Sequence, residues 1–134
     1  QHHLIEDLGI VFGEAVAKAL GAKRGIMRAG SHFAFPMDES LGISAIDLSG
    51  RVKLIWKVKF HEKEVGELKT NVIEDFFEGF VNGARANVYL ESRNVRSTHH
   101  QIEAIFKSFA RCLRMAVELD VRNKRGIMST KGII

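Results

Sequence analysis

Hydrophobic residues recur at three- and four-residue intervals in three stretches of the chain, which is the period of α-helices that bury one face. These stretches predict helices over residues 2–20, 72–84 and 98–119. Gly21 follows the first helix and is the residue type that most often ends one. Capping-box pairs, in which a polar residue is followed three positions later by Glu or Gln, predict where the other two begin: Asn71 with Glu74, and Thr98 with Gln101.

Between the helices, shorter runs rich in β-branched and aromatic residues predict strands over residues 41–48, 52–60 and 86–92. The short link 49–51 is typical of an antiparallel hairpin. Residues 64–70 predict an additional edge strand, and the Gly-rich segment 21–40, which holds the only proline, predicts a connection. The order helix, strand, strand, helix, strand, helix favours an α+β fold of antiparallel strands with helices packed on one face.

Composition favours one domain without a nucleic-acid or membrane partner. The chain has 134 residues, 46% of them hydrophobic, which suffices for a single core. The formal net charge of +4 suits an anionic ligand as well as a nucleic acid, but one Trp and one Tyr offer no platform on which bases could stack. The lone cysteine, Cys112, excludes a disulfide within the chain and fits a buried core position in a protein of the reducing cytoplasm. No apolar run reaches the roughly 20 residues that a membrane span needs, so we expect a soluble, cytoplasmic protein.

Two segments of the chain share one pattern. "HHLIED" begins at His2 and "HHQIEA" at His99, and the two can be laid over one another with further matches at Ile and Phe positions. This repetition predicts an internal duplication within a single domain, 1–134. Residues 1–24 would be the last helix of the first repeat, and residues 25–134 a linker and the second repeat. We therefore expect about one unit's worth of strands and one helix before Gln1.

The repeated HHxxE pattern indicates metal binding. Successive helix residues project about 100° apart, so neighbouring histidines would serve different ions, each with help from the glutamate one turn on. Nitrogen and oxygen ligands without thiolate favour manganese, iron or zinc. An alternative is a non-catalytic, metal-assembled oligomeric binding protein, in which the ions only join subunits. The candidate ligands are His2, His3, Glu6, His99, His100 and Glu103.

Cationic and hydroxyl side chains form a second set of candidates, for binding a phosphate through charge-assisted hydrogen bonds. Lys107 is the strongest of them because it follows His99 by two turns of the same predicted helix. The alternative for each member is an ordinary solvated surface residue. The set comprises Arg28, Arg51, Lys107, Ser129, Thr130 and Lys131.

The segments "HHLIED", "KRGIMRAGSHFAFPMDE", "DLSGR", "HHQIEAIFKSFARCLR" and "STKG" resemble imidazoleglycerol-phosphate dehydratase, in the order in which that family has them. The resemblance implies a duplicated unit of a four-stranded sheet with two helices on one face (ribosomal protein S5 domain 2-like), the second unit complete and the first represented only by its last helix. It implies manganese-dependent elimination of water from imidazole glycerol phosphate to give imidazole acetol phosphate in histidine biosynthesis. It also implies two manganese ions per active site, at subunit interfaces of a homo-oligomeric 24-mer built from trimers.

The resemblance further implies roles for individual residues. One ion would be bound by His3, Glu6 and His99, and the other by His2, His100 and Glu103; Glu6 and Glu103 would thereby be the catalytic carboxylates of this chain. Arg28, Arg51, Lys107, Ser129 and Lys131 match the family's phosphate ligands, with Thr130 between the last two.

The sequence departs from the family pattern in two places. Asp75 stands where many relatives have a histidine ligand, and its carboxylate is either a metal ligand or an ordinary charge in the first helical turn. A histidine ligand and a substrate-binding glutamate from the family's first half are not in this sequence, so an inactive fragment of the enzyme is a further alternative.

Overall fold

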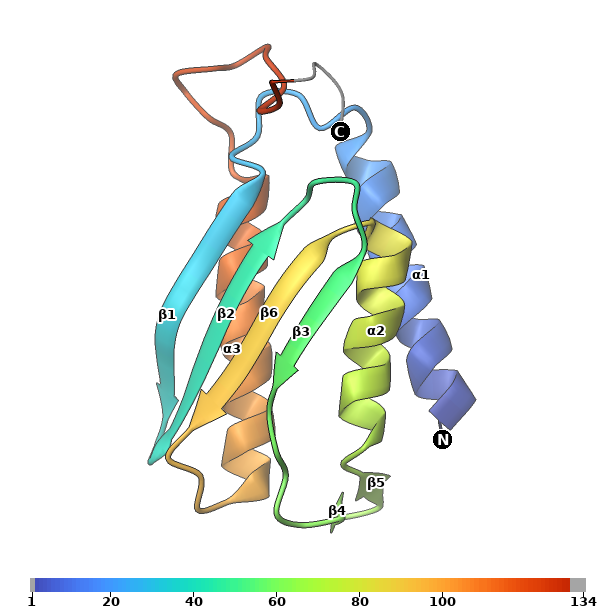
Figure 1. The fold of residues 1–134 in the computed structure, drawn as a ribbon, viewed down its shortest axis with the longest axis vertical. Coiled ribbons are helices and arrows are strands. Elements are labelled where there is room, and N and C mark those ends of the chain that lie inside the picture. The colour runs from blue at the N-terminus through green and yellow to red at the C-terminus, as the bar shows by residue number, and fades with distance from the viewer. Residues whose placement is uncertain (1, 131–134) are drawn as a thin grey trace.

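The computed structural model describes residues 2–130, except for the side chains of residues 33 and 34 (Figure 1). None of the helices in this part of the chain combines the length and the apolar character that a bilayer crossing requires. The elements are α1 (His2–Leu20), β1 (Ala29–Met37), β2 (Ser40–Asp47), β3 (Lys53–Lys57), β4 (Glu64–Val65), β5 (Leu68–Lys69), α2 (Val72–Ala84), β6 (Asn87–Arg93) and α3 (Thr98–Val117).

A four-stranded sheet in the order β1-β2-β6-β3 forms the frame of the molecule. β2 is antiparallel to both of its neighbours, whereas β3 runs parallel to β6. Burial alternates along β2 and β6, as expected for strands with one face on the core. Figure 1 shows α2 and α3 on that face, with α1 packed against α2 and the opposite sheet face uncovered.

The core between the sheet and the helices is dominated by phenylalanines at helical spacing. Phe77 and Phe80 of α2 are fully buried, and each meets the ring of Phe109 on α3 edge to face, at centroid distances of 5.1 and 5.0 Å. Leu90 of β6 and Ile105 of α3 close the layer and are also fully buried. Aromatic contacts of this kind fix how the two helices sit relative to each other.

Glycines allow α1 and α2 to approach closely. A Cβ atom on Gly9 of α1 would overlap the backbone of Phe76, and one on Gly79 of α2 would overlap the backbone of Glu6. These contacts advance together along α1 and α2, so the two helices run parallel and their first turns lie at the same end of the molecule (Figure 1). This packing brings the first histidine motif beside the start of α2.

The predicted α+β fold, a four-stranded sheet with two helices on one face, is confirmed. The first two helices have the predicted bounds, and the third ends at Val117 instead of Leu119. Residues 29–37, predicted as part of a connection, instead form β1. Pro36 is tolerated there because β1 is an edge strand, whose outer side needs no N–H donors.

The predicted hairpin across residues 49–51 is wrong, because β6 lies between β2 and β3. The expectation that all strands are antiparallel is also wrong for the β3–β6 pair. Residues 64–70 do not extend the main sheet; they form the separate two-stranded pair β4–β5, which turns at Gly66 with a φ of 59°. A turn with positive φ favours glycine, and it folds this run back on itself.

The predicted capping boxes are absent at both helices. Asn71 adopts a helical conformation and makes no side-chain cap bond. At α3 the cap lies one residue earlier than predicted, because Ser97 accepts a hydrogen bond from the N–H of His100. The Gln101 side chain is buried and donates instead to the carbonyl of Lys59 and the hydroxyl of Ser92.

Candidate metal and phosphate sites

Both HHxxE motifs occupy first turns of helices at one end of the molecule. His2 and His3 open α1, and His99 and His100 open α3. α2 begins at the same end and carries Asp75 in its first turn (Figure 1). Backbone N–H groups at helix N-termini favour anionic side chains nearby, so carboxylates are expected to gather here.

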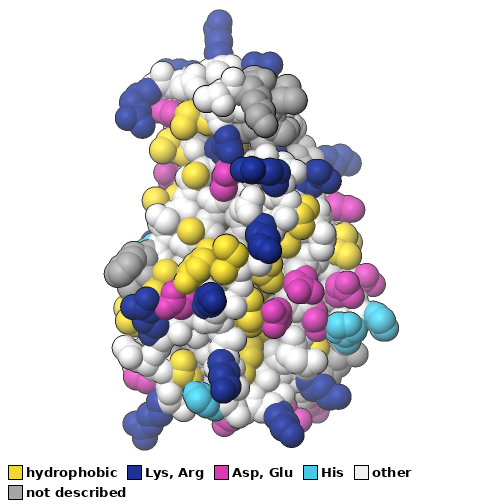
Figure 2. Space-filling view, in the orientation of Figure 1, with side chains coloured by type: hydrophobic (Ala, Val, Ile, Leu, Met, Phe, Trp, Pro, Cys, Tyr) yellow, Lys and Arg dark blue, Asp and Glu magenta, His cyan; other side chains and the backbone are white. Residues whose placement is uncertain are grey.

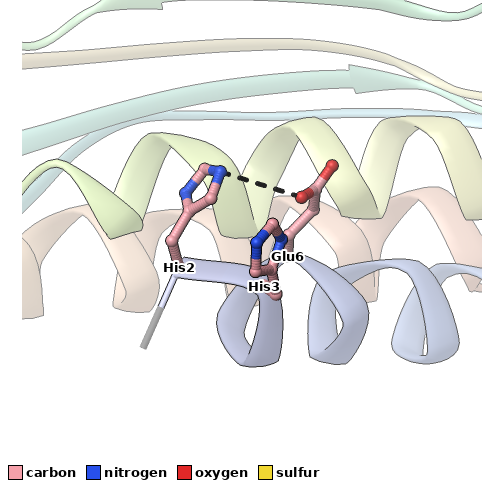
Figure 3. Close-up of side chains that lie close together, drawn as sticks. All are labelled: His2, His3 and Glu6. Carbon is pink, nitrogen blue, oxygen red and sulfur yellow. Dashed lines mark ion pairs between the residues drawn. The ribbon is translucent and has the colours of Figure 1, made fainter.

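The first motif forms a compact set of donors. Ligand atoms of His2, His3 and Glu6 lie within 4.8 Å of one another (Figure 3). His2 Nε2 is 4.0 Å from Glu6 Oε2, and the two imidazole rings are 5.2 Å apart. Neighbouring histidines were expected to diverge. Here they do not, since ligand atoms of both rings lie within 4.8 Å of each other.

Asp75 joins this motif from α2. Its Oδ2 atom lies 2.7 Å from His2 Nδ1, and its side chain is only 20% exposed. Figure 2 shows histidine and acidic side chains together at the right-hand edge of the molecule, over the first turns of α1 and α2. Asp75 thus lies within hydrogen-bonding distance of the first motif, and its role as a metal ligand stays a prediction.

At the second motif the neighbouring histidines diverge as predicted. His99 Nε2 lies 3.4 Å from Glu103 Oε2 on the same helix. Glu103 Oε1 in turn meets the ammonium of Lys107 at 2.5 Å, and the hydrogen bond from Lys107 lowers the pKa of the Glu103 carboxyl. His100 turns the other way, towards the loop between β1 and β2.

That loop supplies two carboxylates that sequence reasoning did not assign. Glu39 Oε2 lies 3.1 Å from His100 Nδ1, and Asp38 Oδ2 lies 3.5 Å from His100 Nε2. Hydrogen bonds from its own backbone N–H, from the N–H of Ser97 and from His100 lower the pKa of Glu39 to about 2. The only sequence signal for these two ligand candidates is the acidic pair in "FPMDES". Its nearness to α3 follows from the pairing of β1 with β2, which the sequence did not predict.

The described residues thus contain two groups able to hold a metal ion, and neither combines both HHxxE motifs. One is His2, His3 and Glu6; the other is Asp38, Glu39 and His100. All donors are imidazole nitrogens or carboxylate oxygens, a set that suits manganese, iron or zinc. Cys112, the only thiol in the chain, is fully buried in the core and takes no part. The donor chemistry fits a divalent metal. Within one chain, each donor group contains residues of only one HHxxE motif.

The candidate phosphate ligands are not gathered in one place either. Arg28, just before β1, is held by both oxygens of Asp47 at 2.6 and 3.0 Å and donates to the carbonyl of Met128. Lys107 contacts Met37 at the other end of β1, with its Nζ 3.7 Å from the sulfur, and lies 5.7 Å from the centre of the Phe35 ring. The two cations therefore lie at opposite ends of β1. The backbone N–H of Arg28 bonds the carbonyl of Ala116, which is nine residues, or about 14 Å, further along α3 than Lys107.

The remaining candidates lie on the Arg28 side. Ser129 and Thr130 directly follow Met128, and Arg51 is exposed in the link between β2 and β3, where its carbonyl accepts a hydrogen bond from Asn87. Lys131 lies outside the described residues. A single chain therefore presents the cations as two separate groups, one around Arg28 and one at Lys107.

Comparison with known proteins gives one consistent family. The sequence profile of imidazoleglycerol-phosphate dehydratase matches residues 1–113. The imidazoleglycerol-phosphate dehydratase of Koribacter versatilis is 50% identical over 134 residues, which cover 100% of this chain and 68% of that protein. The Acinetobacter baylyi enzyme of the same name is 46% identical over 131 residues, or 98% of this chain and 64% of that protein. The chain thus spans about two thirds of the length of these relatives.

Solved structures agree. Imidazoleglycerol-phosphate dehydratase from Staphylococcus aureus superposes with a TM-score of 0.85 at 36% identity, covering 89% of this chain and 69% of that one. The protein from Pyrococcus furiosus superposes with a TM-score of 0.81 at 30% identity, covering 99% of this chain and 71% of that one. Sequence and fold point to the same relatives.

Proposed function

The chain belongs to the imidazoleglycerol-phosphate dehydratase family of hydro-lyases, and from that premise we propose that it contributes to the manganese-dependent removal of water from imidazole glycerol phosphate. The product would be imidazole acetol phosphate, an intermediate of histidine biosynthesis in the cytoplasm. One observation carries the proposal: two HHxxE motifs open parallel helices at one end of the molecule, with imidazole and carboxylate donors exposed.

Two manganese ions per active site would use donors from both motifs. We assign His3, Glu6 and His99 to one ion and His2, His100 and Glu103 to the other. Asp75 is a further oxygen ligand beside His2, supported by its distance of 2.7 Å from that ring. Manganese bound there supplies Lewis-acid polarisation of the substrate's imidazole ring, which makes the adjacent hydroxyl easier to lose.

The chain's own residues position the reacting groups. Glu6 and Glu103 are the catalytic carboxylates in this proposal, because each lies one helical turn from a histidine pair and would bind one of the two ions together with histidines. Lys107 bonds Glu103 at 2.5 Å, so a phosphate bound by Lys107 would lie next to the second motif. Arg28, Arg51, Ser129, Thr130 and Lys131 are the other proposed phosphate ligands. Fixing the phosphate lowers the entropic cost of bringing the ring to the site.

The geometry supports an active site shared between subunits. Within one chain the two motifs belong to different donor groups, and Arg28 and Lys107 lie at opposite ends of β1. A second copy could bring the Arg28 group of one chain to the Lys107 group of another. We propose a homo-oligomer assembled from trimers into a 24-mer, with phosphate substrate bound at its interfaces.

The proposed division into repeats is supported by an uncovered apolar surface. Leu4, Leu8 and Val11 on α1 are 72%, 55% and 61% exposed. Beside them, Phe12, Phe106 and neighbouring residues of α1, α2 and α3 line an apolar groove. We propose that α1 closes a first repeat whose strands and other helix cover this surface, and that residues 25–134 form a linker and a second repeat.

The main test is metal content after changes to one motif. Replacing His99 and His100 together with alanine should abolish stoichiometric manganese, measured by elemental analysis, although His2, His3 and Glu6 remain. His61→Ala, which removes an exposed histidine outside both donor groups, is the control and should keep full metal. Unchanged metal in the double variant contradicts the shared site. The unaltered protein tests the alternative. If it binds metal but neither turns over nor binds imidazole-bearing phosphates, the non-catalytic metal-assembled protein is favoured.

A second test concerns the phosphate. Lys107→Ala should weaken binding of a phosphate-bearing substrate analogue by about 1.5–3 kcal/mol, because it removes a hydrogen bond between charged groups. Arg111→Ala is a matched control: Arg111 also lies 5.7 Å from the centre of the Phe35 ring but is not a proposed phosphate ligand. Calorimetric titration of both variants should show the larger loss for Lys107, and equal losses would mean that only the overall charge of this surface matters.

A further inference from the structure

We infer that Glu39 is a positioning residue: it holds the proton of His100 on Nδ1 and so leaves Nε2 as the metal-binding nitrogen. The inference rests on the proposed function in one respect, the assignment of His100 as a metal ligand. It adds a residue from the β1–β2 loop that neither histidine motif contains.

The two oxygens of Glu39 make different contacts. Oε1 accepts hydrogen bonds from the backbone N–H groups of Ser97 at 2.9 Å and Arg96 at 3.2 Å, immediately before α3. Oε2 lies 3.1 Å from His100 Nδ1. The first oxygen therefore anchors the carboxylate to the start of the helix, while the second faces the imidazole ring one turn further on.

This anchoring decides which nitrogen carries the proton. An ionised carboxylate only accepts hydrogen bonds, so the contact requires an N–H at Nδ1. In a neutral imidazole the lone pair then resides on Nε2, which is the form a metal binds. Metal-bound histidines generally donate their other N–H to a carboxylate or carbonyl, which fixes ring orientation and raises basicity.

The surroundings favour positioning over direct ligation by Glu39. Its Oε1 is already engaged by two backbone donors, and its side chain is 31% exposed. Asp38 is 69% exposed, and its Oδ2 lies 3.5 Å from His100 Nε2, longer than the usual N–H···O hydrogen bond, so Asp38 holds a proton on Nε2 less well than Glu39 holds one on Nδ1.

The tautomer of His100 is the direct readout, because a purely structural role of Glu39 would not change it. Long-range nitrogen–proton NMR spectra of the full, metal-free chain at a pH where imidazole is neutral should show the His100 proton on Nδ1. In Glu39→Ala it should move largely to Nε2, and the manganese dissociation constant should rise about 10- to 100-fold, the range for lost outer-shell partners. A His100 proton on Nε2 in the unaltered protein would overturn the inference without any variant.

Ser97→Ala is the matched control for helix stability. It removes the cap bond to the N–H of His100 but leaves the contact between Glu39 and the ring. We expect a lower melting temperature with the tautomer unchanged and manganese affinity altered less than about twofold. If Ser97→Ala weakens manganese as much as Glu39→Ala does, Glu39 acts only through the helix and the inference is wrong.

The outcomes also separate this inference from the proposed function. If the unaltered chain binds no stoichiometric manganese, the proposed function fails, yet the tautomer comparison still decides the role of Glu39. If Glu39→Ala shifts the tautomer while manganese affinity stays unchanged, the positioning role is refuted and the metal site stands.

Discussion

The thiol of Cys112 illustrates how the core controls a single reactive group. It is fully buried between α3 and β1, and its Sγ lies 3.0 Å from the carbonyl oxygen of Gly30. Burial disfavours the thiolate and raises the pKa of this thiol from 9.0 to about 12. The thiolate is the reactive species, so the native protein should be inert at this residue.

We therefore expect no reaction of Cys112 with a thiol-specific disulfide reagent in the folded protein at pH 8, and full reaction in denaturant. Because the folded thiol holds its proton to higher pH than the unfolded one, this group also makes the free energy of unfolding fall as pH rises from about 9 to 12. Absorbance of the released thiol reports the reaction, and rapid modification of the native chain would contradict the burial.

At the same scale, the sequence predicted site residues that share a helix and missed those that meet through folding. The HHxxE pattern is visible because His99 and Glu103 are neighbours after one helical turn. Glu39 is separated from His100 by 61 residues, and their contact depends on where the β1–β2 loop ends. No local periodicity encodes that meeting, so only the structure reveals it.

Between elements, the contact of α1 with α2 controls the first histidine motif. Gly79 packs directly on the backbone around Glu6, and the two helices run parallel. His2 reaches Asp75 from this arrangement. Any side chain that separates the helices should therefore disturb both stability and the donor set.

Gly79→Ala should lower the free energy of unfolding by about 1–3 kcal/mol, because the added methyl group would overlap the backbone of α1 and overpack the contact. Urea denaturation measures the loss. Glu14→Ala, an exposed change on α1, is the control and should stay within about 0.5 kcal/mol of the parent protein. Equal stability of Gly79→Ala and the parent would mean that α1 is not packed as described.

Elements also differ in how far their sequence predicts them. The helices followed from a period that each segment carries by itself, with Phe77 and Phe80 on the buried face. Strand pairing is not local: the link 49–51 suggested a hairpin, but β6 takes the central place. Val88 and Leu90 of β6 are buried, whereas their β3 partners Leu54 and Trp56 are only half-buried at the edge of the sheet. β1 was not predicted because it contains Pro36, and a proline argues against a strand unless the strand lies at the edge of a sheet.

For the whole molecule, the separation of donors makes assembly part of the proposed chemistry. The two metal-competent groups draw on different helices, and the cations lie at opposite ends of β1. Exposed donors at one end of the domain can be completed by a neighbouring copy. Metal binding and oligomerisation would then be one equilibrium.

The final prediction is that oligomer and metal are lost together. A ligand that binds only the assembled state stabilises that state by mass action, so a chelator should shift the particle from a species near the 24-mer towards trimers, and added manganese should reverse the shift. Light scattering on metal-free and metal-loaded protein measures this. The variant with both His99 and His100 replaced by alanine is the control, because it should be small with or without chelator. A metal-loaded monomer with full ligand occupancy would contradict the shared site. In such a monomer a single chain would bring both HHxxE motifs to the same ions, whereas in the structure the two motifs belong to separate donor groups.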